Sequence, residues 1–375
     1  MELPSYFKDF LKEIRLTDNQ VDELITGHQT LRKRLNEDEV LSKIIVSTFL
    51  QGSYRRATAV RPKSGKRSDV DVIVVTKLSK EEYTPEKALE VFVPFCEKHY
   101  KDKYRIQGRS IGISMSYVDL DIVITAAPSE SELRILESES VRTDQAIDML
   151  EDWKLAKSWI DPNNRMSYRT DQLLKAQNEA EWKTEPLFIP DREAEIWEAT
   201  DPLEQIQWTW DKNKACNSHY VNVVKCIKWW QRSNYPDAGQ PKSYPLEHFI
   251  GQCCPDGINY VAEGVTLTLE KIVSDYSIKP ELPDHGVPEH DVFKRVTDED
   301  YEIFYNQVCE AATIARKALD TENINDSATA WRELFGSKFP EPPSKKEDSS
   351  NGNQRGYTAK SDPGTIGGGR FGKCI

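Results

Sequence analysis

Two linked segments decide the fold of this chain: residues 51–58, with the sequence QGSYRRAT, and residues 68–76, with the sequence SDVDVIVVT. In the second segment acids alternate with β-branched residues before the run becomes fully apolar, a pattern that predicts a strand. Residues two apart on a strand point to the same face, so the carboxylates of Asp69 and Asp71 project together, with Cα atoms about 6.6 Å apart. Such a pair suits two divalent cations about 3.5–4 Å apart, and an all-oxygen ligand set suits magnesium.

A later segment adds a third acidic position. Residues 118–125, VDLDIVIT, predict another strand, on which Asp119 and Asp121 share one face. A third carboxylate near the first two could hold the metal that activates an attacking hydroxyl. A lone Asp-Val-Asp is common at strand ends, but unpaired carboxylates on apolar strands are expensive to bury unless cations or solvent reach them. Together the acids therefore indicate a metal site.

The glycine-serine pair at positions 52 and 53 lies between a predicted strand, residues 44–50, and the acidic strand. Glycine permits a close approach of the backbone, and the N–H groups of such a turn can cradle phosphate. The hydroxyl of Ser53 adds one donor. The pair carries little weight alone and gains its meaning from the acids that follow it.

The rest of the sequence predicts an α+β lobe followed by a mostly helical lobe. The predicted elements are a long helix from Tyr6 to about residue 38, strands at 44–50 and 69–76, one or two strands over 111–117 and 118–125, and helices at 85–100, 220–232, 245–253 and 298–319. This order divides the chain into residues 1–200, with a long N-terminal helix, and residues 201–340. Residues 341–375 are rich in Ser, Gly, Asn, Lys and Pro, the composition of a disordered tail.

The net charge and the cysteine content limit the classes of partner and the cellular compartment that we expect for this protein. The formal net charge is −12, whereas a protein that grips long nucleic acid usually presents a basic face. The acidity therefore favours nucleotide substrates over a long nucleic acid. No apolar run approaches the roughly 20 residues that span a bilayer, so no membrane partner is expected. Seven cysteines at irregular spacing indicate reduced thiols and a cytoplasmic protein.

Taken together, segments 51–58 and 68–72 resemble the Gly-Ser…DhDh signature of the polymerase-beta-like nucleotidyltransferases. Within that superfamily the chain resembles the cGAS/DncV-like (CD-NTase) enzymes of bacterial anti-phage (CBASS) signalling. Asp121-Ile122-Val123 resembles the strand with the third carboxylate, although the family's proline soon after the apolar pair is replaced here by Ile124-Thr125. Asp121 is the preferred third ligand, and Asp119 is the alternative.

Further motifs extend the resemblance into the second half of the chain. Residues 224–230, VKCIKWW, resemble the helix whose lysine contacts the triphosphate, with Lys228 at the matching place. Residues 242–247, KSYPLE, resemble the next motif, in which a serine binds phosphate, here Ser243. Each has a plainer interpretation: Lys228 could lie on the solvated face of an amphipathic helix, and Ser243 could cap the helix near residue 245.

The resemblance implies a bilobal polymerase-beta-like fold and a template-independent nucleotidyltransferase acting on nucleoside triphosphates, ATP among them. Asp69, Asp71 and Asp121 would hold two Mg²⁺ ions, with Mn²⁺ as an alternative. The donor triphosphate would be gripped by four further residues, Gly52, Ser53, Lys228 and Ser243. Repeated transfer and ring closure would give a cyclic di- or trinucleotide second messenger for an effector. The alternatives are a linear oligoadenylate or RNA-end nucleotidyltransferase, and a non-catalytic nucleotide-binding protein, which is expected to lack one of the acids.

The C-terminal stretch 364–375, GTIGGGRFGKCI, has a composition flexible enough to enter a partner protein. Some enzymes of the family that the chain resembles are conjugated through the C-terminus by ubiquitin-transfer-like machinery. That resemblance implies a linkage at Gly372 or Ile375. The plainer interpretation is a passive chain end.

Overall fold

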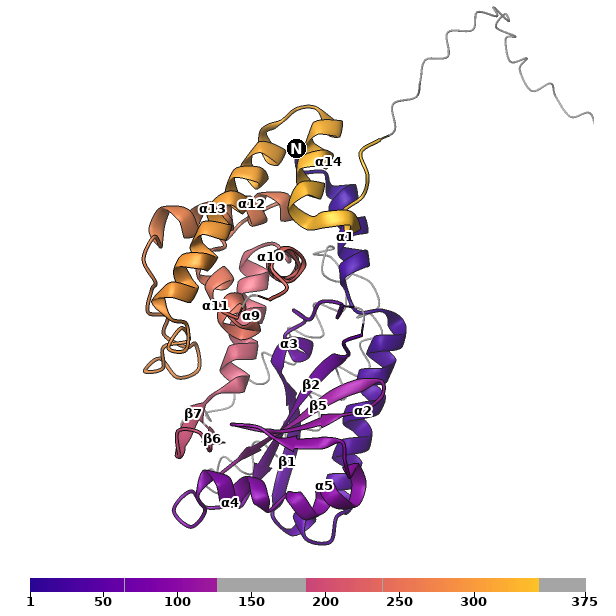
Figure 1. The fold of residues 1–375 in the computed structure, drawn as a ribbon, viewed down its shortest axis with the longest axis vertical. Coiled ribbons are helices and arrows are strands. Elements are labelled where there is room, and N and C mark those ends of the chain that lie inside the picture. Colours follow the sequence, from indigo (N-terminus) through magenta and orange to yellow (C-terminus); the bar gives the residue numbers. More distant parts are fainter. Residues whose placement is uncertain (64, 127–186, 238, 344–375) are drawn as a thin grey trace, which may run out of the picture. The chain divides into compact units, whose positions relative to one another are not determined.

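A five-stranded mixed sheet carries the acidic segments (Figure 1). The computed structural model describes residues 1–63, 65–126, 187–237 and 239–343. Across the sheet the strands are β1 (Ile45–Gln51), β2 (Ser68–Thr76), β5 (Val118–Thr125), β4 (Ile111–Ser114) and β3 (Tyr104–Ile106). Neighbouring strands are antiparallel except β2 and β5, which are parallel. The strands predicted around both acidic segments are confirmed, whereas β3 was not predicted.

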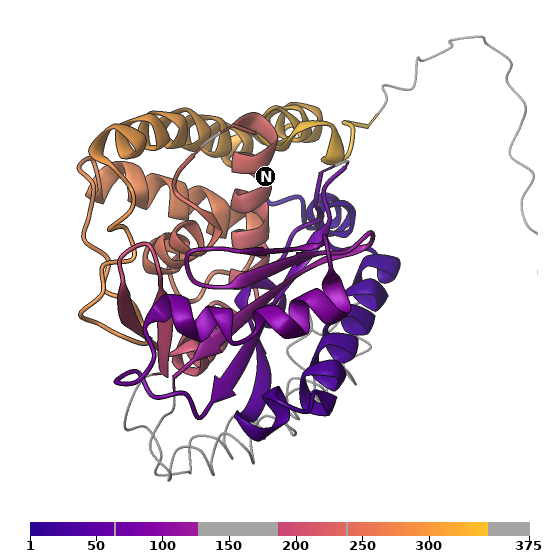
Figure 2. The ribbon, with the colours of Figure 1, turned by 60° about the horizontal axis from the view of Figure 1, so that its bottom comes forward.

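The two faces of the sheet are covered differently. Helices α2 (Asp18–Glu37), α4 (Pro85–Glu90) and α5 (Val93–Tyr100) cover one face (Figure 2), against the inward side chains of Val70, Val72 and Val74. On the other face Ile73, Val75 and Val123 form a small cluster with Leu187 of the hairpin β6 (Leu187–Asp191) and β7 (Ile196–Thr200). Because side chains alternate along a strand, Asp69 and Asp71 continue this second face.

Two predicted helices are each divided in the structure. The N-terminal helix is α1 (Pro4–Ile14) followed by α2, because Thr17 and Gln20 form a capping box that starts a new helix. The helix predicted over residues 85–100 ends at Glu90 and restarts as α5 with Pro94 in its first turn. Proline has no N–H to give and its ring clashes with the preceding turn, so it begins a helix more readily than it continues one.

The second half of the chain is helical around a separate core. Its elements are α9 (Pro202–Ala215), α10 (Tyr220–Asn234), α11 (Ser243–Cys253), α12 (Val261–Asp275), α13 (Asp298–Asp320) and α14 (Ile324–Phe335), with a short 3₁₀ turn at Gly336–Lys338. Another 3₁₀ turn, Leu41–Lys43, precedes β1 in the first half of the chain. Helix α10 is buried along most of its length, and Phe7 and Phe10 of α1 belong to the same core. The N-terminal helix thus packs with the helical half, beside α14 (Figure 1), and not with the sheet.

Residues 1–342 form one compact unit. The predicted boundary at residue 200 remains a prediction. The predicted disordered tail lies outside the described residues from position 344 onward, and so do Gly372 and Ile375. In the part of the chain that the structure describes, no helix has the length and apolar character needed to cross a membrane.

Candidate active site

The register of β2 and β5 brings the predicted acids together. Asp69 is paired with Asp119 and Asp71 with Asp121 in this parallel ladder, and paired residues of parallel strands point to the same side of the sheet. The four carboxylates therefore lie on one face, at the end of the strands where the apolar cluster stops. Asp69 is exposed, and the side chains of Asp71 and Asp121 are half-buried.

Asp119 and Asp121 differ in the side chains that they bind in the structure. Both Nε and Nη2 of Arg67 lie within 3.1 Å of Asp119 Oδ1, so this carboxylate already has a cation. Among the described residues, the donors to Asp121 Oδ1 are neutral: Gln107 Nε2 at 3.0 Å and Ser110 Oγ at 3.2 Å. In this part of the chain Asp121 therefore has no cationic hydrogen-bond partner, unlike Asp119, and its role as third ligand stays a prediction.

The surroundings of Asp71 oppose its ionised form. Burial raises the pKa of its carboxyl to about 8, with further increases from Asp69 and Asp121, while Arg56 acts in the opposite direction. Burial also raises the pKa of Asp121. Three acids held this close disfavour one another's ionised forms, and a bound cation would relieve the repulsion. In the described residues no three His, Cys, Asp or Glu side chains are already gathered as a metal-binding cluster, so ion binding would require these side chains to turn together.

Gly52 approaches Asp71 more closely than any other residue type could. The glycine follows the last residue of β1 and begins the one-turn helix α3 (Gly52–Arg55), with a φ of 77°. A Cβ added at this position would lie 1.9 Å from Asp71 Oδ2. The close contact at this turn is with the Asp71 carboxylate, and the phosphate contact expected from the sequence stays a prediction.

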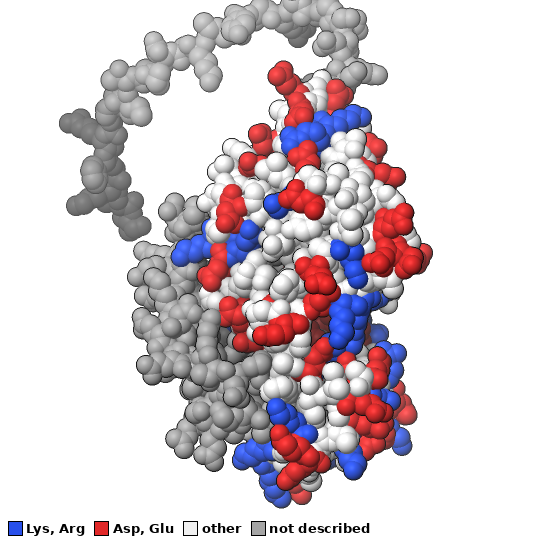
Figure 3. All heavy atoms as spheres, turned by 90° about the vertical axis from the view of Figure 1, so that its left-hand side faces the viewer, with Lys and Arg blue, Asp and Glu red and all other residues white. Residues whose placement is uncertain are grey.

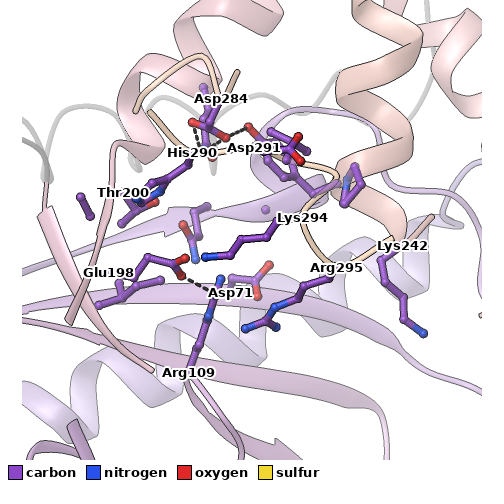
Figure 4. A pocket seen from close by; sticks show the side chains of 18 of the residues that line it. Asp71, Arg109, Glu198, Thr200, Lys242, Asp284, His290, Asp291, Lys294 and Arg295 are labelled. Atoms are coloured by element: carbon purple, nitrogen blue, oxygen red, sulfur yellow. Dashed lines mark hydrogen bonds and ion pairs between the residues drawn. The ribbon is translucent and has the colours of Figure 1, made fainter. Parts of the chain in front are cut away.

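A cavity of about 430 Å³ opens beside this turn. Two of the residues predicted for the site, Gly52 and Asp71, line it. The ends of the Lys294 and Arg109 side chains converge in this cavity (Figure 4), and Arg109 is paired with Glu198. The other charged residues of the lining are Arg56, Lys242, Arg295, Asp284 and Asp291. Over the face shown in Figure 3 charges of both signs are interspersed, without a continuous basic surface.

The remaining predicted residues lie nearby in different settings. Ser53 is in α3, and its carbonyl accepts hydrogen bonds from the N–H groups of Thr58 and Ala59. Lys228 is not on a solvated face: it is 5% exposed, and its Nζ lies 3.5 Å from Glu247 Oε2. Ser243 is exposed as the first residue of α11, and this helix has no side-chain cap, so the capping interpretation does not hold.

The sequence analysis missed several lining residues. The guanidinium of Arg56 lies 5.0 Å from the ring centroid of Tyr244, whose hydroxyl donates a hydrogen bond of 2.6 Å to Asp284. Asp284 also accepts from Gln205 and from the N–H of Gly286. Arg56 and Tyr244 are part of motifs that were quoted for other residues, so the signal was present. Their spatial neighbours come from distant segments, which no local pattern reveals.

A mixed sheet with acids on two adjacent strands, a glycine turn beside them and a helical second part is the arrangement of the polymerase-beta-like nucleotidyltransferases. The comparisons make this class more specific. Residues 1–138 match the Second Messenger Oligonucleotide or Dinucleotide Synthetase domain. The probable cyclic AMP-AMP-GMP nucleotide synthase of Salmonella paratyphi B is 45% identical over 375 residues, which cover 97% of each chain. The cyclic AMP-AMP-GMP synthase of Enterobacter hormaechei subsp. hoffmannii is 44% identical with the same coverage.

Solved structures agree in fold. The chain matches the Vibrio cholerae DncV cyclic AMP-GMP synthase with a TM-score of 0.61 and 13% identity, over 91% of this chain and 98% of that one. It matches Escherichia coli MS115-1 CdnC, solved with ATP, with a TM-score of 0.63 and 16% identity, over 90% and 98%. The chain belongs to the cGAS/DncV-like (CD-NTase) family and is a cyclic oligonucleotide synthase. The predictions of family, fold class and enzymatic activity are confirmed.

Proposed function

We propose that the product is a cyclic trinucleotide built from two AMP units and one GMP unit. The relatives with 45% and 44% identity are both named for this product, whereas a cyclic AMP-AMP-AMP synthase of an Acinetobacter strain is 27% identical over 365 residues. ATP and GTP are then the substrates, and three successive transfers release three pyrophosphates and close the ring. We further propose that this molecule is a second messenger in anti-phage defence.

Enzymes of this family generally use divalent metal ions, and the acids of this chain fit that requirement. Burial, and then the neighbouring carboxylates of Asp69 and Asp121, raise the pKa of Asp71 to about 8, and a bound cation would favour the ionised form that this setting opposes. The missing side chain at Gly52 leaves room for the Asp71 carboxylate, because a Cβ there would lie 1.9 Å from its Oδ2. Asp69, Asp71 and Asp121 would hold two Mg²⁺ ions, for which Mn²⁺ could substitute. When bound, such ions lower the pKa of an attacking hydroxyl and neutralise charge on phosphate oxygens.

The protein itself supplies position and local charge. The N–H groups at Gly52 and Ser53, the ammonium group of Lys228 and the hydroxyl of Ser243 are proposed to grip the donor triphosphate. The ends of the Lys294 and Arg109 side chains converge in the cavity, where they would attract further phosphate groups. Phosphoryl transfer depends largely on such positioning and charge neutralisation.

The single observation that carries the proposed site is the parallel pairing of Asp71 with Asp121, next to the Asp69–Asp119 pair. Purified protein should be incubated with all four nucleoside triphosphates and Mg²⁺, and its products identified by mass spectrometry and phosphatase digestion. We expect a phosphatase-resistant product with the mass of cyclic AMP-AMP-GMP, made by wild type and not by the Asp69→Asn, Asp71→Asn double variant. A phosphatase-sensitive product would instead identify a linear polymerase, and full synthesis by the double variant would disprove this site.

The C-terminal stretch is proposed to take part in conjugation to a partner protein through Gly372 or Ile375, as the family resemblance implies. Mass spectrometry of the protein from cells that carry the neighbouring genes would detect such a linkage. Recovery of only the unmodified C-terminus would leave the passive chain end as the better interpretation.

A further inference from the structure

Glu247 in α11 lies at the centre of a buried charge cluster behind the candidate active site. Its Oε1 accepts a hydrogen bond of 2.6 Å from Arg56 Nε. Its Oε2 accepts one of 2.6 Å from Thr58 Oγ1, and Lys228 Nζ lies 3.5 Å from the same oxygen. Glu247 is 2% exposed, and none of its three partners is more than 6% exposed. Both oxygens of one carboxylate thus join the segment after β1, helix α10 and helix α11.

A buried charge cluster of this kind contributes little to the stability of a protein. Desolvating charges costs several kcal/mol per ion, and well-packed apolar side chains of similar volume often serve a core as well or better. The charges nevertheless remain: burial opposes the ionised form of Glu247, but Arg56 and Lys228 leave its pKa below the ordinary value. A role in the reaction would explain why these groups are present.

The two cations that Glu247 binds are also near the two acids of β2. Arg56 lines the same cavity as Asp71, and its charge counteracts the rise in the pKa of Asp71. Asp69 is among the groups whose charge acts on the ammonium of Lys228. Each cation therefore has Glu247 as its direct partner and also interacts electrostatically with one aspartate of β2. Within the described residues the ion pairs of both cations are made with Glu247 and not with the two aspartates.

We propose that Glu247 is a positioning residue that holds Arg56 and Lys228 away from Asp69 and Asp71, so that these carboxylates stay open to divalent cations. The inference rests on the proposed metal site. Without a negative charge at position 247, the two cations would remain under the attraction of the β2 carboxylates with which they already interact, and charge attraction in a partly desolvated site is strong. The cations would then compete directly with the metal ions.

The test is Mn²⁺ binding without nucleotide, measured by calorimetry and by the loss of the free-ion electron paramagnetic resonance signal. In Glu247→Gln, which keeps the side-chain shape and removes the charge, we expect Mn²⁺ affinity to fall about tenfold, as one regained charge interaction would cause. The Mn²⁺ concentration that gives half-maximal synthesis should rise by the same factor, and most of the wild-type kcat should return at saturating Mn²⁺. A variant with a structural defect would keep a low kcat even at saturating Mn²⁺. Native Mn²⁺ affinity in a folded Glu247→Gln protein overturns the proposal.

Thr58→Val is the matched control, because it removes a hydrogen bond to the same carboxylate while leaving every charge in place. We expect its Mn²⁺ affinity to stay within about twofold of wild type, since no counter-ion is lost. An equal loss in both variants would point to packing and overturn the proposal.

Two further variants keep the outcome interpretable. If Glu247→Gln does not fold, the double variant Arg56→Gln, Glu247→Gln can be used in its place. It removes both partners of one ion pair and leaves Lys228 without its carboxylate partner. This protein should bind Mn²⁺ more weakly than wild type, and unchanged affinity overturns the proposal. Asp71→Asn tests the metal site itself: if it binds Mn²⁺ as wild type does, the proposed site fails. If Asp71→Asn loses binding and Glu247→Gln does not, only the positioning role fails.

Discussion

At Gly52 the backbone and a carboxylate come closer than any side chain permits. A Cβ there would lie 1.9 Å from Asp71 Oδ2, and the φ of 77° is one that residues with side chains rarely adopt. We expect Gly52→Ala to push Asp71 aside and reduce kcat by about 100-fold, because a displacement of about 1 Å at a reacting centre costs this much. Steady-state synthesis of the cyclic product measures the effect.

Gly65 provides the matched control for this substitution. Its φ is 81°, so alanine meets the same backbone strain there, but an added Cβ has nothing within 4 Å. Gly65→Ala should therefore lose stability of about 1 kcal/mol and keep its kcat. Equal losses of kcat in the two variants would show that backbone conformation, and not the contact with Asp71, matters at position 52.

Single residues also show where sequence reasoning succeeds. Alternation along each strand was enough to predict that Asp69 and Asp71 share one face of their strand and that Asp119 and Asp121 share one face of theirs, because strand periodicity is a local property. That the two pairs lie on the same face follows from the parallel pairing of β2 with β5, which was not predicted. The partnership of Arg56 with Glu247 was not predictable, since 191 positions separate the two residues and nothing in either local pattern indicates the other.

At the scale of elements, three rings from three segments stack beside the cavity. His285, in the connection between α12 and α13, lies 3.7 Å from Trp208 of α9 and 4.0 Å from His248 of α11, between ring centroids. Burial, and then the neighbouring His248, lower the pKa of His285 to about 3, while Asp284 acts in the opposite direction. The stack therefore contains a histidine that stays neutral at ordinary pH.

The sign of the resulting pH dependence follows from proton binding. Between pH 6.5 and 3 the unfolded chain binds a proton at His285 that the native protein does not, so stability is lost as pH falls through this window. At pH 5, about 1.5 units below the ordinary histidine pKa of 6.5, this loss in the free energy of unfolding is about 2 kcal/mol. His285→Phe keeps a ring in the stack and cannot titrate. We expect its urea midpoint to fall less than that of wild type between pH 7.5 and pH 5.

A second substitution separates titration from stacking. His285→Gln removes both the titrating group and the stacked ring. Its stability should therefore depend on pH as weakly as that of His285→Phe, and should be lower than that of His285→Phe at both pH 7.5 and pH 5. If His285→Phe and wild type lose stability in parallel on acidification, other groups in this region, such as His248, account for the pH dependence.

The helices illustrate what periodicity alone misses. Apolar spacing predicted one helix over residues 6–38 and another over 85–100, whereas the structure divides each of them. Both breaks were encoded locally, by the capping pair Thr17 and Gln20 and by Pro94. The β6–β7 hairpin, which covers the apolar part of the acid-bearing face, was not predicted, because its short strands lack a strong alternation.

At the scale of the whole molecule, the start of the chain folds with its helical second half. The amino group of Met1 donates a hydrogen bond of 2.7 Å to the carbonyl of Ala318 in α13. Arg15 Nη2 donates one of 2.6 Å to Asn222 Oδ1 of α10. Sequence order assigned the N-terminal helix to the first lobe, because a local pattern shows that a helix is amphipathic without showing which core receives its apolar face.

Phe7 tests this arrangement. The residue is 2% exposed and makes edge-on contacts with Trp331, Phe335 and Phe339 at centroid distances of 5.0, 5.9 and 5.3 Å. Phe7→Ala would leave a cavity among these rings and should destabilise the protein by about 3–5 kcal/mol, measured as a lower urea midpoint.

Lys8→Ala, on the exposed side of the same turn, is the control and should have the urea midpoint of wild type. Because Phe7 belongs to the helical core and not to the clusters of the acid-bearing sheet, kcat at a temperature where the variant is folded should be retained. A Phe7→Ala protein as stable as Lys8→Ala would mean that α1 adds little to the helical core, and that its place there is not needed for folding.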